Sequence, residues 1–300
     1  MTTLRKPDWL KISLETGERY TETKKIVEMN RLHTICSSGH CPNASKCWGI
    51  GTATFMIAGD ICTRSCKFCA TKTGRPLPLN EEEPMKVAKS VKLMKLKHCV
   101  ITSVDRDDLE DKGAEHWRKT IEAIRKENPD TTIEVLTPDF DGKKELIDTV
   151  LSAKPDVFSH NMETVKRLTD ATRSKAKYDI SLTTLKYATD KQFITKTGIM
   201  LGLGETKSEV VEIMSDVRKI GVQLFTIGQY LQPTKQHLKV KEYITPEQFI
   251  EYKKIGMQMG FKNVESGPLV RSSYMAEKAF IEAGLSKKQK SIDSGYNSIN

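Results

Sequence analysis

Six of the seven cysteines in this chain of 300 residues fall between Cys36 and Cys69, and this crowding limits what the chain can be more than any other feature. The first residues, Met1 to Glu18, are charged and lack the apolar stretch of a secretory signal, so we expect a cytoplasmic protein. Thiols stay reduced there, and their crowding therefore indicates metal or redox chemistry instead of disulfides. The seventh, Cys99, lies in an apolar stretch and is predicted to be a core thiol.

One triplet consists of Cys62, Cys66 and Cys69, with the spacing CxxxCxxC, and it directly follows a predicted strand. Three thiolates on one short loop can hold three irons of a cubane and leave the fourth iron open to substrate. A structural zinc site normally takes four protein ligands, and a simple electron-transfer cluster takes four cysteines. The pattern therefore favours a cluster with an open iron, with zinc and a plain redox cluster as the alternatives.

A second triplet lies upstream and consists of Cys36, Cys41 and Cys47, with the spacing CxxxxCxxxxxC and no fourth cysteine nearby. His40 is a further candidate ligand, although it adjoins Cys41 and would have to point the same way. The sequence thus carries two incomplete sets of thiol ligands close together.

From residue 53 onwards, short apolar runs alternate with amphipathic helical patterns. The predicted strands are 54–58, 99–102, 132–136, 157–160, 198–201, 224–227 and 263–265. Their nearly continuous apolar character is typical of parallel strands that are covered on both faces. We therefore predict an α/β fold whose parallel sheet is either open or curled into a partial or full barrel, with the loops after the strands at one rim. In a barrel that rim carries the active site.

Several helices carry start and stop signals. Thr206 and Glu209 form a capping-box pattern before an apolar stripe that ends at Gly221, and Thr245 precedes a second helix that opens with proline and ends at Gly260. A third helix contains apolar residues at helical spacing from Trp117 to Ile124. We divide the chain into an N-terminal extension (1–52), the repeating core (53–267) and a C-terminal segment (268–300), whose polar end from Ser286 is predicted to be a mobile tail.

The charge balance of 48 basic against 39 acidic residues gives a net charge of +9, which favours an acidic partner. No helix-turn-helix, RNP-type or zinc-finger pattern supports nucleic-acid binding. No apolar run approaches the roughly 20 residues that span a bilayer, so no membrane segment is predicted. Nothing in the sequence demands more than a monomer.

The first triplet, on the first loop of a strand–helix repeat, resembles the radical S-adenosylmethionine (SAM) superfamily, and the two triplets together resemble the lipoyl synthases within it. The resemblance extends over nearly the whole chain, including residues 51–57, 100–108, 158–163, 202–205 and 228–233. It implies a radical-SAM type of (β/α) barrel with N- and C-terminal extensions, SAM as cofactor, and two [4Fe–4S] clusters, of which the 62–69 cluster binds SAM and the upstream one is auxiliary.

In that family a serine of a C-terminal Arg-Ser-Ser-Tyr motif completes the auxiliary cluster. This chain has Arg271-Ser272-Ser273-Tyr274, so the resemblance implies that Ser273 is the fourth ligand and that Arg271 and Ser273 take part in catalysis. Without the cysteines, the same four residues would read as an ordinary polar loop. Met275 stands where many relatives carry a histidine, so no histidine is available at that position.

The resemblance also implies the reaction and the partners. The substrate is an octanoyl chain on a lysine of a lipoyl carrier domain, either an E2 subunit or the glycine-cleavage H protein, and two sulfurs enter at C6 and C8 from the auxiliary cluster. These carbons are unactivated, so a 5′-deoxyadenosyl radical from SAM is needed. A low-potential donor such as ferredoxin or flavodoxin supplies the electrons.

Residues after the predicted strands are expected to line the rim and contact SAM. The candidates are Thr102, Ser103, Asp105, Asn161, Glu163 and Gly202. Arg106 and Arg173 are further candidates for the SAM carboxylate, and Phe68 for shielding the cluster or packing on adenine. For each of them, ordinary loop polarity, helix capping or core packing is the alternative.

Two rival functions remain. Another radical-SAM sulfur-inserting enzyme would keep the 62–69 triplet but would not need Cys36, Cys41, Cys47 and Ser273 together. A non-catalytic iron–sulfur carrier would need no strand–helix core of about 200 residues, the size range of a whole barrel.

Overall fold

The computed structural model describes residues 5–12 and 17–285, and an eight-stranded sheet forms its centre. The strand order is β1-β2-β5-β6-β7-β8-β9-β10; neighbours from β2 to β10 are parallel, and β1 pairs antiparallel with β2. The strands are β1 (His33–Thr34), β2 (Phe55–Ile57), β5 (His98–Ser103), β6 (Thr132–Leu136), β7 (Val157–Ser159), β8 (Thr195–Leu201), β9 (Leu224–Gln229) and β10 (Asn263–Gly267). Because β1 and β10 do not pair with each other, the predicted barrel is a partial one.

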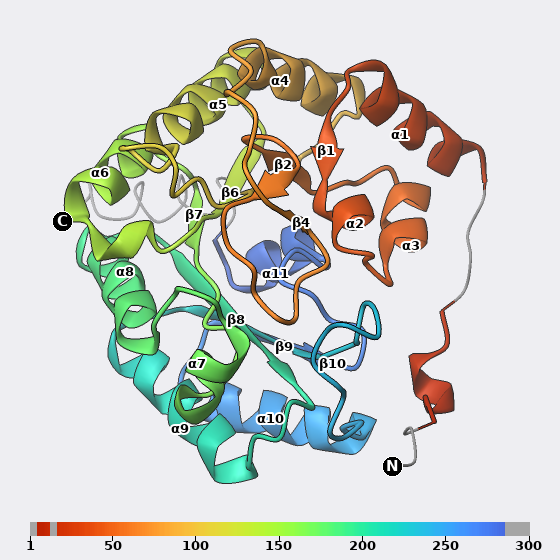
Figure 1. Ribbon diagram of the computed structural model, residues 1–300, viewed down its shortest axis with the longest axis vertical. Coiled ribbons are helices and arrows are strands. Elements are labelled where there is room, and N and C mark those ends of the chain that lie inside the picture. The colour runs from red at the N-terminus through yellow and green to blue at the C-terminus, as the bar shows by residue number, and fades with distance from the viewer. Residues whose placement is uncertain (1–4, 13–16, 286–300) are drawn as a thin grey trace, which may run out of the picture.

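Helices surround the sheet, as the view along the barrel in Figure 1 shows. The longer ones are α1 (Glu18–Met29), α4 (Glu83–Leu93), α5 (Ala114–Glu127), α6 (Lys144–Ser152), α8 (Tyr178–Asp190), α9 (Lys207–Lys219) and α10 (Pro246–Gln258). The shorter ones are α2 (Ile35–Ser38), α3 (Ala44–Gly49), α7 (Thr169–Thr172), α11 (Ala276–Glu282) and the 3-10 turns 8–10, 140–142 and 166–168. A separate parallel pair of short strands flanks the loop that carries Cys62, Cys66 and Cys69. The strand β3 (Ile61–Cys62) precedes this loop, and β4 (Lys72–Thr73) follows it.

All seven predicted strands are present, and the predicted capping signals operate. At α9 the Thr206 side chain accepts from the Glu209 backbone N–H, and the Glu209 carboxylate accepts from the Thr206 N–H. At α10 the Thr245 side chain accepts from the backbone N–H of Gln248, without the reciprocal bond seen at α9. These local hydrogen bonds satisfy the first N–H groups of each helix, which otherwise have no partner.

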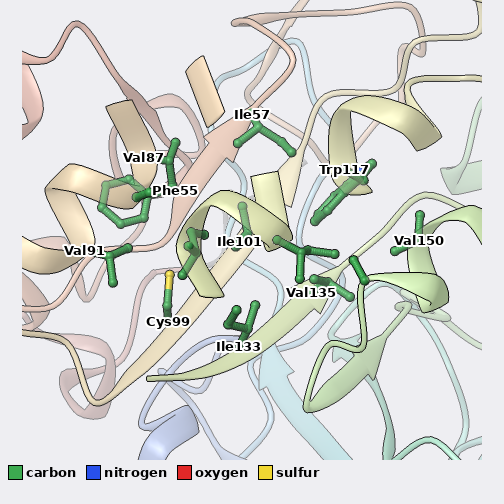
Figure 2. Close-up of a cluster of buried hydrophobic side chains, with 14 of the residues drawn as sticks. Phe55, Ile57, Val87, Val91, Cys99, Ile101, Trp117, Ile133, Val135 and Val150 are labelled. Atoms are coloured by element: carbon green, nitrogen blue, oxygen red, sulfur yellow. The ribbon is translucent and has the colours of Figure 1, made fainter. Parts of the chain in front are cut away.

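Alternation along the strands sorts side chains between the outside and the inside of the barrel. The outward set packs under α4, α5 and α6 and includes Cys99, Ile101 and Val135, all fully buried (Figure 2). Cys99 is thus confirmed as a core thiol. The residues between them, such as His98, Val100 and Thr102 on β5, face the interior and line its cavity.

Charged side chains fill the barrel interior near the N-terminal ends of the strands. Lys196 Nζ lies 2.8 Å from Glu134 Oε1, and His98 Nε2 lies 3.5 Å from Glu134 Oε2, with all three side chains buried. Burial alone would raise the pKa of Glu134, but Lys196 and His98 outweigh it and lower that pKa to about 2. Phe280 of α11 stacks against the His98 ring with centroids 5.6 Å apart, so the C-terminal helix covers this end.

The N-terminal extension is more closely joined to the barrel than the strand–helix alternation predicts, because its strand β1 extends the sheet at β2. The tail predicted from Ser286 lies outside the described residues. Within residues 5–12 and 17–285, no helix has both the length and the apolar character needed to cross a membrane.

Candidate active site

A single cavity of about 940 Å³ opens at the carboxyl ends of the strands, and all six cysteines of the two triplets line it. The same cavity reaches the strand ends of β5 and β7 and the segment from Val270 to Ala276. Residues more than 200 positions apart in the sequence therefore meet in one chamber, at the rim where parallel barrels place their active sites.

The 62–69 loop leaves β3 and presents its thiols to this cavity. Cys62 Sγ accepts hydrogen bonds from two backbone N–H groups, those of Arg64 at 3.4 Å and Asp105 at 3.3 Å. Burial and the nearby Asp105 carboxylate raise the pKa of the Cys62 thiol to about 12. The two N–H groups favour the thiolate, which is the form that binds metal.

The 36–47 triplet is held by short helices. Cys36 belongs to α2, whose first turn is capped by Thr34, and Cys47 belongs to α3. The Cys41 N–H donates to the Cys36 carbonyl at 3.0 Å, which closes the turn between them. Burial, followed by the neighbouring Cys36 and Cys41, raises the pKa of Cys47 to about 12. His40 also lines the cavity, in a left-handed backbone conformation (φ 48°).

The segment 269–275, here called the serine segment, lies between the auxiliary triplet and the strand ends. Asn43 Nδ2 donates to the Leu269 carbonyl at 2.6 Å, and Lys46 Nζ lies 3.1 Å from the Tyr274 hydroxyl. On the other side, a side chain at Gly228 would have its Cβ 2.0 Å from the Val270 carbonyl oxygen, so only glycine admits this approach. These contacts hold Ser273 at the cavity wall.

Five of the six residues predicted to contact SAM line the cavity, namely Thr102, Ser103, Asp105, Asn161 and Glu163. Gly202 does not. It has φ +103°, and an added Cβ would lie 2.2 Å from Gln229 Nε2, so this glycine is required by local packing.

Three of these polar residues already have partners within the protein, and one of them is Asp105, whose carboxylate lies 3.3 Å from Arg64 Nε. The Thr102 hydroxyl donates to the Leu136 carbonyl at 3.0 Å, and Asn161 Nδ2 donates to Ser272 Oγ at 2.7 Å. Burial raises the pKa of Glu163, although the positive charge of Arg173 partly opposes this effect. The hydrogen bond between Asn161 and Ser272 connects the loop after β7 to the serine segment.

Arg106 and Arg173, the two arginines predicted to bind the SAM carboxylate, differ in location. Arg173 lines the cavity, and its guanidinium donates to Ser181 Oγ at 2.8 Å. Arg106 is not part of the cavity wall; it is buried, pairs with Asp108 at 2.9 Å and donates to the Ala58 carbonyl. Phe68 lies at the cavity, as expected from its place between Cys66 and Cys69.

Sequence reasoning missed two buried groups beside the cavity, Arg64 and His160. Arg64 lies within the triplet itself, where its partners are Asp105 and three further aspartates. His160 directly follows β7; its Nδ1 donates to the Thr137 carbonyl at 2.9 Å and its Nε2 lies 2.9 Å from Ser181 Oγ. Burial is the chief cause that lowers its pKa to about 4. The predicted strand ends do not indicate either residue, because the predicted strand 157–160 includes His160 and Arg64 lies six residues after the predicted strand 54–58.

The donor sets fit two iron–sulfur clusters. Each triplet offers three free thiols to the same cavity, and the structure describes every cysteine of the chain as a free thiol. Among residues 5–12 and 17–285, no three His, Cys, Asp or Glu side chains converge as a site for one metal ion. Soft thiolates are the donors that iron–sulfur clusters take, and a set of three leaves one iron of a [4Fe–4S] cluster without a protein thiol.

Comparisons with known proteins give the family. A model of the Radical SAM superfamily matches residues 56–217. A lipoyl synthase of Bacteroides fragilis is 62% identical over 275 residues, which cover 92% of this chain and 96% of the relative, and one of Treponema denticola is 57% identical over 274 residues, 91% and 94% of the two chains. Crystalline methylornithine synthase shares the fold, with a TM-score of 0.57 over 83% of this chain and 75% of that one at 12% identity. The chain belongs to the lipoyl synthase family of the radical SAM superfamily.

Proposed function

We propose that this lipoyl synthase inserts sulfur at C6 and C8 of an octanoyl chain carried on a lysine of a lipoyl carrier domain. The observation that carries this proposal is the single cavity lined by both cysteine triplets and Ser273. A shared chamber allows one acyl chain to meet the hydrogen-abstracting group and the sulfur source without leaving the protein.

The chemistry explains why the residues come in two incomplete sets. No side-chain acid or base can remove hydrogen from an unactivated methylene or methyl carbon. When bound, SAM and the two clusters supply the radical chemistry and the sulfur. The protein then has to hold one cluster through Cys62, Cys66 and Cys69, and the other through Cys36, Cys41 and Cys47 with one further ligand.

Ser273 is the proposed further ligand, in preference to its neighbour. The Ser272 oxygen accepts a hydrogen bond from Asn161, whereas the Ser273 side chain has no hydrogen bond to any residue that the structure describes. A hard serine oxygen is an unusual partner for iron beside soft thiolates. We therefore expect it to be released when the auxiliary cluster gives up sulfur.

Arg271 is the proposed counter-charge of the auxiliary site. Its guanidinium donates to the Val270 carbonyl at 2.7 Å, and none of the described carboxylates forms an ion pair with it. Burial lowers its pKa, and the neighbouring Cys41 opposes that shift. A cation in this position stabilises the negative charge of three thiolates and their cluster.

For SAM we propose contacts with Ser103, Asp105, Asn161 and Glu163, and with Arg173 for the carboxylate. All five line the cavity on the side of the 62–69 loop, at strand ends or in the loops that follow them. We also propose a division of the chain into an extension (1–52), a barrel core (53–267) and a C-terminal segment (268–300). Each part then contributes one set of proposed cluster ligands: the 36–47 triplet, the 62–69 triplet and Ser273, respectively.

The proposed partners follow from charge and chemistry. A net charge of +9 suits an acidic carrier domain, either an E2 subunit or the glycine-cleavage H protein. A low-potential donor such as ferredoxin or flavodoxin would deliver electrons. We propose a cytoplasmic monomer that binds neither nucleic acid nor membrane.

The test is a single anaerobic turnover of the reconstituted chain with SAM, dithionite and an octanoyl-lysyl peptide. The proposal requires a product that has gained two sulfurs, together with 5′-deoxyadenosine. SAM cleavage without a thiolated product would indicate a different radical-SAM reaction, and absence of cleavage with both clusters intact would indicate an electron carrier.

Ser273→Ala tests the ligand assignment, with Ser272→Ala as the matched control of equal size. We expect Ser273→Ala to keep the 62–69 cluster and its SAM cleavage while sulfur insertion is lost. Normal double insertion by Ser273→Ala would remove this assignment.

A further inference from the structure

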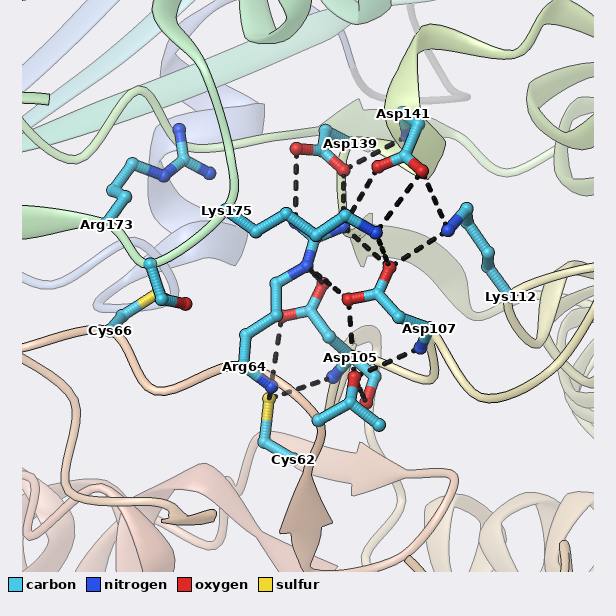
Figure 3. A network of polar contacts seen from close by, with 12 residues as sticks. Cys62, Arg64, Cys66, Asp105, Asp107, Lys112, Asp139, Asp141, Arg173 and Lys175 are labelled. Atoms are coloured by element: carbon cyan, nitrogen blue, oxygen red, sulfur yellow. Dashed lines mark hydrogen bonds and ion pairs between the residues drawn. The ribbon is translucent and has the colours of Figure 1, made fainter. Parts of the chain in front are cut away.

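Arg64, between the first two cysteines of the 62–69 loop, is surrounded by carboxylates. Its side chain is only 4% exposed, and it forms ion pairs with four aspartates, which are Asp105, Asp107, Asp139 and Asp141 (Figure 3). Lys112 and Lys175 join the same group of charges. We call these seven residues the Arg64 network.

The Arg64 guanidinium makes two bidentate contacts with carboxylates. Nε and Nη2 donate to the two oxygens of Asp107 at 2.8 and 3.1 Å, and Nη1 and Nη2 donate to the two oxygens of Asp139 at 3.1 and 2.9 Å. A lysine ammonium has the charge but not the planar set of five donors, so it cannot reproduce two bidentate contacts at once. Asp139 is 1% exposed, which leaves Arg64 as its main compensation.

The network joins the cysteine loop to three other loops. Asp105 and Asp107 follow β5, Asp139 and Asp141 follow β6, and Lys175 lies between α7 and α8. Three positive charges meet four negative ones, and the carboxylate that most needs compensation is Asp139, because it is buried while the other three are partly exposed. Arg64 alone contacts all four.

These contacts fix the backbone around Cys62. The Asp105 N–H points at Cys62 Sγ (3.3 Å), and the Thr63 hydroxyl donates to the Asp105 carbonyl at 2.9 Å. The Asp107 N–H in turn donates to the Thr63 hydroxyl at 3.0 Å. Because Arg64 holds the side chains of Asp105 and Asp107, it sets the distance between this stretch and the thiol.

The other triplet has nothing comparable. Around Cys36, Cys41 and Cys47 the contacts include backbone hydrogen bonds, the Thr34 cap, the Thr52 hydroxyl on the Cys47 carbonyl (3.1 Å) and the Asn43–Leu269 bond. No network of ion pairs centred on a buried arginine is found there among residues 5–12 and 17–285. A defect in the Arg64 network should therefore affect one cluster and spare the other.

We propose that Arg64 is a positioning residue for the cluster of the 62–69 loop: its guanidinium holds Cys62 in the geometry that receives the cluster, without serving as a ligand. This inference rests on the proposed assignment of Cys62, Cys66 and Cys69 as cluster ligands. Arg64 would act as a residue that orients metal ligands without binding the metal itself. Loss of such a residue typically lowers metal affinity about 10- to 100-fold.

The test measures each cluster by itself. Arg64→Met is placed in two backgrounds, one lacking the auxiliary cysteines (C36A/C41A/C47A) and one lacking the loop cysteines (C62A/C66A/C69A). Iron and sulfide are counted after anaerobic reconstitution, and the affinity of the cluster is followed by competition with a chelator. We expect about a 10- to 100-fold loss of cluster affinity in the first background and unchanged iron content in the second.

Conservative variants show whether geometry or charge matters. Arg64→Lys should restore only part of the affinity, and Asp139→Asn should give an intermediate loss, since each keeps one bidentate contact at most. The change that SAM causes in the electron paramagnetic resonance spectrum of the reduced cluster should be weaker in Arg64→Lys. Arg118→Met removes a partly exposed arginine paired with Glu115 and Glu122 and is the matched control.

Equal iron loss from both backgrounds, or loss of the far-ultraviolet circular dichroism of a folded chain, would make Arg64 a general structural residue and overturn the proposal. Unchanged cluster affinity in the first background would overturn it as well. A failure of the proposed function is seen separately, because it appears in the turnover of the unmodified chain and not in these iron counts.

Discussion

The two cysteine triplets face the same cavity but are held in place by different forces. The 62–69 loop is tied to three neighbouring loops by a buried network of charges centred on Arg64. In the 36–47 triplet, Cys36 and Cys47 lie on short helices and Cys41 lies between these helices; a few hydrogen bonds join this region to the serine segment. A fixed support suits a cluster that is kept through every turnover, and a few separable contacts suit a cluster that is taken apart.

The contrast extends to the origin of the ligands. All three thiols of the 62–69 loop come from one stretch of eight residues, so the site depends on local geometry. The proposed auxiliary site combines the N-terminal extension with the serine segment, since Asn43 contacts Leu269 across 226 positions. Its assembly therefore requires the folded barrel between them.

The largest expected effect comes from removing each triplet in turn. C62A/C66A/C69A should abolish 5′-deoxyadenosine formation, because no open iron is left to bind SAM. C36A/C41A/C47A should still cleave SAM but give no sulfur-containing product. Mass spectrometry of both products after one turnover checks this, and SAM cleavage by the first variant would erase the distinction between the triplets.

Next comes the scaffold that both triplets share. Lys196→Met leaves the buried Glu134 carboxylate without its cation, which should lower the free energy of unfolding by about 3–5 kcal/mol. Because the pair lies at the closed end of the barrel, both clusters should be lost together. Lys186→Met, which removes an exposed pair with Asp190, should change stability by less than about 0.5 kcal/mol in the same denaturant titration. Selective loss of one cluster in Lys196→Met would contradict this account.

A pH titration separates the buried histidine from the carboxylates. Burial lowers the pKa of His160 from 6.5 to about 4, so the folded state keeps it neutral while the unfolded state takes up a proton. Its contribution is therefore fully present above pH 6.5 and is lost as the pH falls towards 4, by up to about 3 kcal/mol. The free energy of unfolding in urea is measured between pH 4 and 6.5 for the unmodified chain and for His160→Gln. It should fall with decreasing pH through His160 in the unmodified chain, and this dependence should be absent in His160→Gln. Parallel curves would show that another group is responsible.

A smaller effect is expected at the link between the auxiliary triplet and the serine segment. Asn43→Ala leaves the Leu269 carbonyl without its donor and should cost about 1–3 kcal/mol of stability, with a lower auxiliary iron content. Asn128→Ala removes a similar bond to the Ala88 carbonyl, far from both triplets, and should leave both iron counts unchanged. Equal iron content in the two variants would show that the link does not support the auxiliary site.

Much of this could be predicted from local sequence patterns. Seven strands, the caps at Thr206 and Thr245 and the core position of Cys99 follow from periodicity and hydrogen-bonding chemistry within a few residues. The two triplets follow from spacing. Features that depend on contacts between distant segments could not be predicted in this way.

The Arg64 network is the clearest of those features. Asp139 lies 75 positions beyond Arg64, and neither residue belongs to a motif that indicates a pair. Gly202 is a second example, since the sequence does not indicate that this glycine has φ +103° and packs closely against Gln229. The antiparallel strand β1 is only two residues long and gives no period to detect.

The most direct test of the central claim is a sulfur-labelling experiment in a single turnover. The chain is reconstituted with ³⁴S-sulfide in both clusters and incubated with unlabelled SAM and an octanoyl-lysyl peptide. The account predicts that both inserted sulfurs carry ³⁴S and that the iron and sulfide left on the protein correspond to the 62–69 cluster alone. A product that contains unlabelled sulfur, or a protein that retains both clusters intact after insertion, would contradict it.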